Sequence, residues 1–165
     1  MKFKEVKGDL IKNALNGDYD VIAHGCNCFC TQGAGIALQM KNTFDTHKYP
    51  MEASVFKGDI NKLGTIGSNS FDLYARKLFV VNAYTQFEPG KNLDHVALSM
   101  CMKKINYNYK GMRIGLPLIG CGIAGGIWDF THVKDPLDPN NLPYIKNIIL
   151  DELTDMDVTI VHYEK

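Results

Sequence analysis

The sequence lacks any apolar run close to the roughly 20 residues of a membrane span. Residues 1–7 alternate polar and apolar side chains, unlike the continuous apolar segment of a signal peptide. An excess of one charge is also missing, because 18 basic and 18 acidic residues are spread without blocks of one sign. These absences argue against membrane, secreted and nucleic-acid-binding proteins. We therefore expect a cytoplasmic protein with a small-molecule partner, and neither nucleic acid nor membrane as a partner.

Signals for disulfides and metals are missing as well. Five cysteines are an odd number, and without a secretory signal a disulfide framework is not expected. Cys26, Cys28 and Cys30 form a C-x-C-x-C run, but this spacing sends alternate side chains to opposite sides of an extended chain. No second ligand pair follows at a zinc-like spacing, so we expect no metal and no cofactor. A cysteine phosphatase needs an arginine that closes the thiolate loop, and the only arginines are Arg76 and Arg113.

What the sequence contains is an alternation of strand-like and helix-like apolar segments, without repeats or linkers. This pattern is typical of an α/β fold whose mixed or parallel central sheet carries helices on both faces, and we expect one domain over residues 1–165. The predicted strands are Phe3–Val6, Val21–His24, Leu78–Ala83, Ile114–Leu118 and Val158–Tyr163. The predicted helices are Gly35–Phe44, Tyr49–Lys57, Leu93–Tyr107 and Pro143–Leu153.

Two of these helices carry apolar stripes that we expect to pack on the sheet. The first stripe consists of Ile36, Met40 and Phe44. The second stripe consists of Leu93, Val96, Ala97, Met100 and Ile105.

Two glycine-rich loops each follow an apolar run typical of a buried strand. The first contains Gly33, Ala34, Gly35, Ile36 and Ala37. The second contains Gly120, Cys121, Gly122, Ile123, Ala124, Gly125 and Gly126. Glycine lets backbone N–H groups approach an anion closely, and a helix N-terminus adds a favourable partial charge. Tight turns need glycine for backbone reasons alone, so either loop by itself is weak evidence, but together they predict a cradle for a diphosphate.

Other reactive side chains have a structural explanation. His24 lies on the strand that leads into Asn27, and we expect it to satisfy buried backbone groups rather than act as a base. Cys121 lies where N–H groups can activate a thiol, but packing is the preferred explanation. Residues 129–143 hold three prolines and form either a lid beside the second glycine loop or a tolerated insertion.

The order of the motifs resembles that of macro domains, which recognise ADP-ribose. Gly8-Asp9-Leu10 is similar to the short element before their first binding loop. The run from Val21 to Asn27, followed by residues 33–40, resembles that loop, and residues 116–128 resemble the second, diphosphate-embracing loop. The resemblance covers essentially the whole chain. It implies a three-layer α/β/α macro-domain fold with a central mixed sheet and ADP-ribose or a derivative as the ligand.

The resemblance also implies roles for single residues. Asp9 would accept a hydrogen bond from the adenine amine, the Leu10 backbone would support the base, and Asn27 would contact the distal ribose. Asp9 has a structural alternative as the cap of the turn after the first strand. The implied ligand-binding residues are Asp9, Leu10, Cys26, Asn27, Gln32, Gly33, Ala34, Gly35, Ile36, Ala37, Gln86, Gly120, Cys121, Gly122, Ile123, Ala124, Gly125 and Gly126.

Departures from the family pattern matter for activity, because one fold serves several functions. Macro domains that remove ADP-ribose from acidic side chains or DNA bases rely on a lysine after the third strand and, in one group, on an aspartate in the second loop. Here those places hold Asn82–Gln86 and Ala124, and the nearest lysine is Lys91. Lysine-based glycohydrolysis is therefore disfavoured.

The second loop is closer to that of phage and fungal ADP-ribose 1″-phosphate phosphatases. This likeness implies hydrolysis of the terminal phosphomonoester by water, with Asn27, Asp129 and His132 as catalytic candidates. Two alternatives stay open. One is a non-catalytic module that binds ADP-ribose, a nucleotide signal or an ADP-ribosylated protein, and the other is a glycohydrolase that works without the usual lysine.

Overall fold

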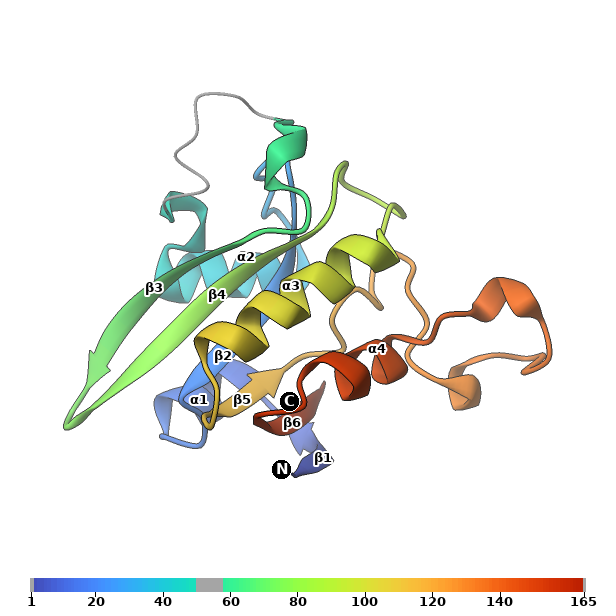
Figure 1. Ribbon diagram of the computed structural model, residues 1–165. Coiled ribbons are helices and arrows are strands. Elements are labelled where there is room, and N and C mark those ends of the chain that lie inside the picture. The colour runs from blue at the N-terminus through green and yellow to red at the C-terminus, as the bar shows by residue number, and fades with distance from the viewer. Residues whose placement is uncertain (1, 50–57, 165) are drawn as a thin grey trace.

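A mixed sheet forms the centre of the computed structural model, which describes residues 2–49 and 58–164 (Figure 1). Its strands in the described chain are β1 (Phe3–Gly8), β2 (Val21–Asn27), β3 (Ile66–Leu73), β4 (Arg76–Gln86), β5 (Arg113–Leu116) and β6 (Asp157–Tyr163). They lie in the order β1-β6-β5-β2-β4-β3. Neighbouring strands are parallel, except for the antiparallel pair of β3 and β4. The expected mixed sheet is confirmed.

Helices cover both faces of this sheet. The helices α1 (Leu10–Leu15) and α2 (Gly35–Phe44) lie on one face, and α3 (His95–Asn108) and α4 (Ile145–Glu152) lie on the other (Figure 1). Short 3-10 helices occur at Thr46–Lys48, Ile60–Lys62, Phe130–His132 and Pro139–Asn141. The arrangement is the three-layer α/β/α fold that the resemblance implied.

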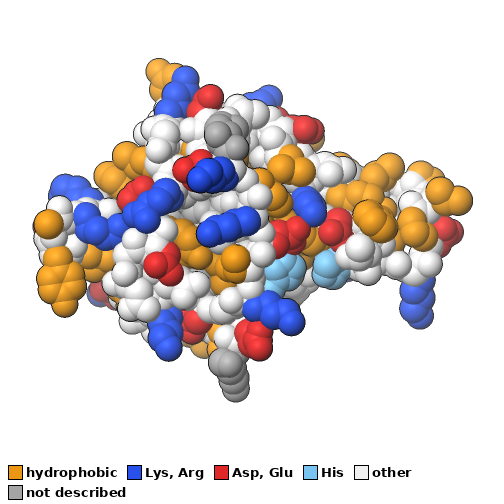
Figure 2. Space-filling model, turned by 90° about the horizontal axis from the view of Figure 1, so that it is seen from below, with side chains coloured by type: hydrophobic (Ala, Val, Ile, Leu, Met, Phe, Trp, Pro, Cys, Tyr) orange, Lys and Arg blue, Asp and Glu red, His pale blue; other side chains and the backbone are white. Residues whose placement is uncertain are grey.

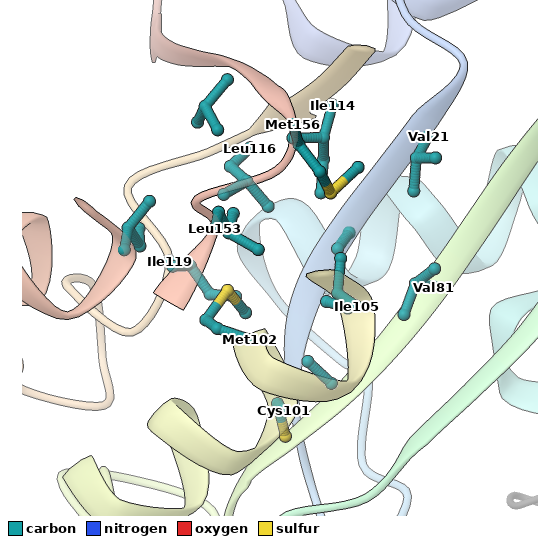
Figure 3. Close-up of a cluster of buried hydrophobic side chains, with 14 of the residues drawn as sticks. Val21, Val81, Cys101, Met102, Ile105, Ile114, Leu116, Ile119, Leu153 and Met156 are labelled. Atoms are coloured by element: carbon teal, nitrogen blue, oxygen red, sulfur yellow. The ribbon is translucent and has the colours of Figure 1, made fainter. Parts of the chain in front are cut away.

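The core follows from the alternation of side chains along the buried strands. On β2, Val21 and Ala23 join the cluster beneath α3 and α4 (Figure 3), whereas Ile22 joins the cluster beneath α1 and α2. A strand buried on both faces has a nearly continuous apolar sequence, which explains why β2 is visible in the sequence. Full burial of one such aliphatic side chain contributes about 1.5–3 kcal/mol.

The five predicted strands are confirmed, and their ends shift for local reasons. The strand β5 ends at Leu116, because Pro117 has no N–H to continue the ladder. The strand β4 is longer than predicted at both ends. Arg76 and Lys77 extend it by pairing with β3, and Tyr84 and Gln86 extend it by pairing with β2. The helix expected over 49–57 lies outside the described residues, except for Tyr49, which is extended.

The predicted apolar stripe of α3 is wrong in part. Asp94 is the N-cap, and its Oδ1 accepts from the Ala97 amide at 2.9 Å, so the helix begins after Leu93. Val96 and Met100 are 70% and 42% exposed. The buried stripe is instead formed by Ala97, Leu98, Cys101, Met102 and Ile105. Ala97, Cys101 and Ile105 repeat at a spacing of four residues and so share one face.

Candidate functional site

The two glycine loops leave the sheet side by side, because each follows the carboxyl end of one of two neighbouring parallel strands, β2 and β5. A Cβ on Gly25 of β2 would lie 3.5 Å from Cγ1 of Ile119, the residue directly before the second loop. The same Cβ would lie 3.0 Å from Oγ1 of Thr85 on β4. This edge, outside the carboxyl ends of the strands, is where ligands bind in open α/β sheets.

The first loop presents uncommitted backbone amides. Within the described chain, the N–H groups of residues 33–37 donate to no backbone or side-chain acceptor. A Cβ on Gly33 or Gly35 would meet no atom beyond its chain neighbours within 4 Å, and Gly35 has a φ of +57°. The first turn of α2 therefore offers N–H groups and a positive helix end to open space.

The second loop folds back on itself. The Gly126 amide donates to Gly120 O at 2.7 Å, and the Gly125 amide donates to Gly122 O at 3.1 Å. These bonds leave the amides of residues 122–124 without an acceptor among the described residues. A Cβ on Gly122 would also meet open space. Both loops can thus bind an anion through N–H groups that the fold itself does not use.

Lys91 lies at the second loop, which the sequence did not predict. A Cβ on Gly125 would lie 3.0 Å from Cε of Lys91, so the exposed lysine packs along the loop. The Leu93 amide donates to Ala124 O at 3.2 Å and holds the two segments together. Gln86, an expected ligand-binding residue, is 9% exposed, and its Nε2 donates to Glu88 O and Gly90 O. It therefore shapes the segment that carries Lys91.

Asn27 organises the segment that leads into the first loop. Its Oδ1 accepts from the amides of Phe29 at 2.9 Å and Thr31 at 3.3 Å, and its Nδ2 donates to Thr31 O at 3.0 Å. The carboxamide has two N–H groups, so one remains for a ligand hydroxyl or a water. The side chain is 8% exposed.

Asp9 and Leu10 begin α1. Oδ1 of Asp9 accepts from the Lys12 amide at 3.1 Å, so the capping role that stood as the alternative is observed. Asp9 also lines a groove of ≈460 Å³ between α1 and α2, to which α2 contributes Gln39. Leu10 is 3% exposed and packs in the core, which leaves its backbone for any contact with a base.

No protein-family model matches the chain. An uncharacterized 17.5 kDa protein from the tk-vs intergenic region of Enterobacteria phage T4 is 37% identical over 136 residues, which are 80% of this chain and 86% of the phage protein. The chain belongs to the same family as this phage protein.

Several solved structures with a similar fold are macrodomains. The macrodomain of Thermus aquaticus DarG matches with a TM-score of 0.66 at 18% identity, over 99% of this chain and 98% of that one. Thermosipho africanus DarTG, solved in complex with ADP-ribose, matches with a TM-score of 0.70 at 16% identity. That match covers 98% of this chain and 42% of DarTG. The chain has the macrodomain fold.

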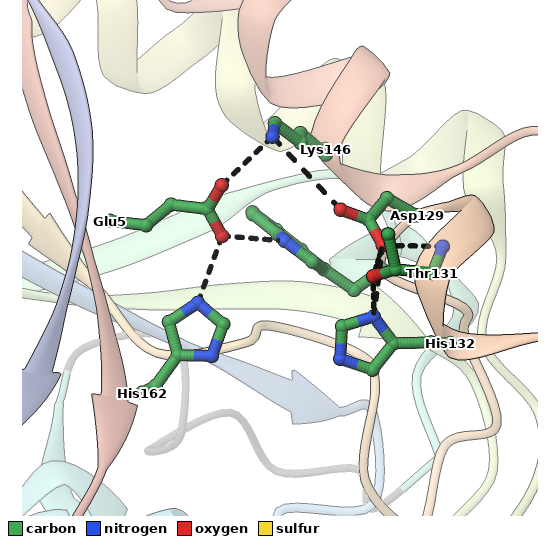
Figure 4. A network of polar contacts seen from close by, with 7 residues as sticks. Glu5, Asp129, Thr131, His132, Lys146 and His162 are labelled. Carbon is green, nitrogen blue, oxygen red and sulfur yellow. Dashed lines mark hydrogen bonds and ion pairs between the residues drawn. The ribbon is translucent and has the colours of Figure 1, made fainter.

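Asp129 and His132 lie in a polar network of this macrodomain (Figure 4). Oδ1 of Asp129 accepts from Nδ1 of His132 at 2.9 Å and from Thr131, and its Oδ2 lies 4.0 Å from Nζ of Lys146. Partial burial acts to raise the pKa of Asp129, but hydrogen bonds from Thr131 and His132 outweigh it and hold the pKa below its usual value. Asp129 is therefore a carboxylate at neutral pH.

The same network fixes the end of the second loop. Glu5 on β1 accepts from Trp128 Nε1, His162 Nε2 and Lys146 Nζ, each at 2.8 Å. Trp128 is 1% exposed, and its carbonyl accepts from the Lys146 amide at 3.1 Å. No local pattern predicts this network, because Glu5, Trp128 and His162 are more than 30 residues apart in the chain.

Residues 129–143 project away from the sheet (Figure 1), and on the same side of the molecule the space-filling view shows a protruding lobe (Figure 2). Phe130, Leu137 and Leu142 are 61%, 90% and 57% exposed. Of the two alternatives for this segment, a tolerated insertion fits the exposed side chains better than a lid closed over the second loop.

His24 and Gln32 are buried behind the first loop of the macrodomain. Nε2 of His24 donates to Oδ1 of Asn82 at 2.7 Å, so its partner is a side chain rather than the backbone groups that we expected. Complete burial lowers the pKa of His24 to about 4, against the opposing effect of that hydrogen bond. Gln32 is 5% exposed; its Oε1 accepts from Thr46, and its Nε2 lies 4.0 Å from Sγ of Cys26.

Cys121 is a packing residue, as predicted. Burial raises the pKa of its thiol to about 12, and its Sγ donates to Ile119 O at 3.5 Å. Across the described residues, no three His, Cys, Asp or Glu side chains gather in a way that holds a metal ion. In the same part of the chain, no helix is long and apolar enough to cross a bilayer.

Proposed function

We propose that the macrodomain binds ADP-ribose across the two glycine loops and hydrolyses the terminal phosphate of ADP-ribose 1″-phosphate to ADP-ribose and phosphate. The proposal rests above all on two sets of uncommitted amides, at residues 33–37 and 122–124, on loops that follow neighbouring strands. Thermosipho africanus DarTG, part of which has a similar fold, was solved in complex with ADP-ribose, and this supports the choice of ligand.

Phosphoryl transfer needs positioning and neutralisation of the phosphoryl oxygens more than covalent help from the protein. In our proposal the amides of both loops hold the diphosphate, and Lys91 adds a positive charge beside Gly125. The remaining N–H of Asn27 orients a ribose hydroxyl or the attacking water. Asp129 is the candidate base because it is ionised, and His132 is its hydrogen-bond partner.

A second candidate function is a non-catalytic reader of ADP-ribose or of an ADP-ribosylated protein. The observation that favours it is the commitment of Asp129 and His132 to contacts with Thr131 and Lys146, which already use the carboxylate. A reader needs only the two amide cradles.

Calorimetry with ADP-ribose, beside phosphate release from ADP-ribose 1″-phosphate, tests both functions on one preparation. We expect saturable binding, a rise in Tm with ligand concentration, and release of phosphate. Adenosine is the binding control, and ADP-ribose itself is the control for phosphate release. Binding of ADP-ribose without phosphate release would support the non-catalytic reader and contradict the phosphatase. Binding of ADP-ribose no tighter than that of adenosine would contradict both functions.

Asp9→Ser should weaken ADP-ribose binding by about 1.5–3 kcal/mol, because a charge-assisted hydrogen bond to the adenine amine is lost. Serine keeps an N-cap for α1, so the fold should be retained. Calorimetry with ADP-ribose and with ribose 5-phosphate, which has no base, checks the prediction.

Asp9→Ala is the matched variant for the capping role. It should show the same loss of ADP-ribose affinity, with about 1 kcal/mol of additional destabilisation from the missing cap. If Asp9→Ser weakened both ligands equally, the carboxylate would act on the fold and not on adenine.

A further inference from the structure

A buried lysine is directed at a cysteine of the segment before the first glycine loop. Lys62 ends the 3-10 helix Ile60–Lys62 and is 1% exposed. Its Nζ donates to Sγ of Cys30 at 2.9 Å, and the same Nζ lies 5.9 Å from the centre of the Tyr84 ring. Lysine is almost never fully buried unless its ammonium group is paired. The sulfur of Cys30 is the partner that accounts for the buried position of Nζ.

Backbone contacts fix both partners. The Lys62 carbonyl accepts from the Thr65 amide at 2.9 Å and from Thr65 Oγ1 at 2.6 Å, and the Gly64 amide donates to Tyr84 O at 2.8 Å. The Cys30 amide donates to Asn27 O at 3.3 Å, and Cys30 has a φ of +62°. The contact therefore joins two well-anchored segments that are 32 residues apart.

The surroundings distinguish Cys30 from other cysteines of the chain. An ammonium group beside sulfur favours the thiolate, which is the form that reacts with oxidants. Cys30 is only partly buried, so a small oxidant can reach it. Burial instead raises the pKa of Cys101 and of Cys121 to about 12, which keeps both as unreactive thiols at neutral pH.

We propose that Cys30 and Lys62 form a modification site for hydroperoxides, in which oxidation ends in a covalent sulfur–nitrogen bond. In the first step the Cys30 thiolate attacks one peroxide oxygen. The S–O bond forms, the O–O bond breaks, and the departing hydroxide takes a proton to become water. The product is a sulfenic acid, and hydrogen peroxide is the two-electron oxidant.

In the second step Lys62 captures the sulfenic acid. Nζ first gives up one proton to solvent, and its lone pair then attacks Sγ. The S–N bond forms, the S–O bond breaks, and the departing hydroxide takes a second proton from the nitrogen to become water. No further oxidant is needed, and a thiol reductant reverses the product. The bond closes a loop between residues 30 and 62, so it should raise Tm by roughly 5–10 °C by restricting the unfolded chain.

The test treats the full chain with hydrogen peroxide, with and without dimedone as a trap for sulfenic acid, and maps the peptides by mass spectrometry. We expect Cys30 to be trapped at least about tenfold faster than Cys101 or Cys121. Without the trap, the peptides that contain Cys30 and Lys62 should appear joined, lighter than their sum by two hydrogens, and separate again in dithiothreitol.

Lys62→Met removes the ammonium and the nucleophile while keeping a long apolar side chain. It should slow trapping at Cys30 about tenfold and abolish the joined peptide. Lys77→Met, at an exposed lysine on β4, is the matched control and should change neither. If dimedone trapped Cys30 no faster than Cys121 in the wild-type protein, the proposed site would be overturned. This comparison uses only the wild-type protein, so it does not depend on whether the variant folds. Sulfenic acid without the joined peptide would overturn the capture step.

Discussion

Gly122→Glu should reduce the affinity for ADP-ribose by at least about 100-fold, or about 3 kcal/mol. Gly122 lies between the amides of the second loop, and a side chain there points into space that no protein atom occupies. A glutamate would fill the space proposed for the diphosphate and bring a negative charge against it. Phosphate release should be lost together with binding, because the same amides hold the ground state and the reacting group.

The substitution is informative because Gly122 does not need to be glycine for the fold. Its φ lies outside the left-handed region and its Cβ position is open, so stability should change by no more than about 0.5 kcal/mol. Gly125 would be a poorer choice, since its φ is +87° and Lys91 packs against it.

Gly122→Gln is the control, because it has nearly the same bulk without the charge. Calorimetry on both variants separates the charge repulsion between glutamate and the diphosphate from the loss of space in the second loop. Urea unfolding checks that both variants keep the stability of the wild type. If Gly122→Glu bound ADP-ribose as tightly as the wild type, the second loop would not hold the diphosphate.

The sequence predicted those parts of the fold whose burial leaves a local pattern. The strand β2 is apolar on both faces, and the helix α2 keeps Met40 and Phe44 on its buried face, so each is visible in a short window. The edge strand β3 was missed because Gly67-Ser68-Asn69-Ser70 has little strand propensity, and its pairing with β4 holds it in place. The helix α1 has only six residues, and its capping residue Asp9 was its main signal.

In the candidate site, too, some residues could be predicted from a local pattern, and others depend on contacts between distant segments. The two glycine loops could be predicted because a cradle of backbone amides needs glycine, which the sequence shows directly. That these loops hold a ligand stays a prediction. The position of Lys91 was not predicted, since it depends on the contact between the segment after β4 and the loop after β5. The contact of Lys62 with Cys30 was missed for a similar reason, because it joins residues that no local spacing relates.

The free energy of unfolding should fall by about 2 kcal/mol between pH 6.5 and pH 5 because of His24. The ordinary pKa of histidine, 6.5, applies to the unfolded chain, and burial lowers the pKa in the fold to about 4. Between these values the unfolded chain binds a proton that the folded chain does not. The stability is therefore fully present above pH 6.5 and is lost as pH falls toward 4, at about 1.4 kcal/mol per pH unit.

Urea unfolding at pH 7.5, 6.5 and 5 measures this loss, and His24→Gln is the matched variant, because its amide can still donate to Asn82. The pH interval matters, since the carboxylates with lowered pKa values, Glu5, Asp20 and Asp129, lose their contribution only at lower pH. The variant should show a slope between pH 6.5 and 5 that is smaller by the His24 contribution. A variant with the wild-type slope, or a His24 ring that titrates near pH 6.5 by NMR in the folded protein, would show that the ring is not buried as a neutral imidazole. A ring that stays neutral to below pH 5 would confirm that His24 is buried as a neutral imidazole beside Asn82, whose Nδ2 in turn donates to Thr46 O.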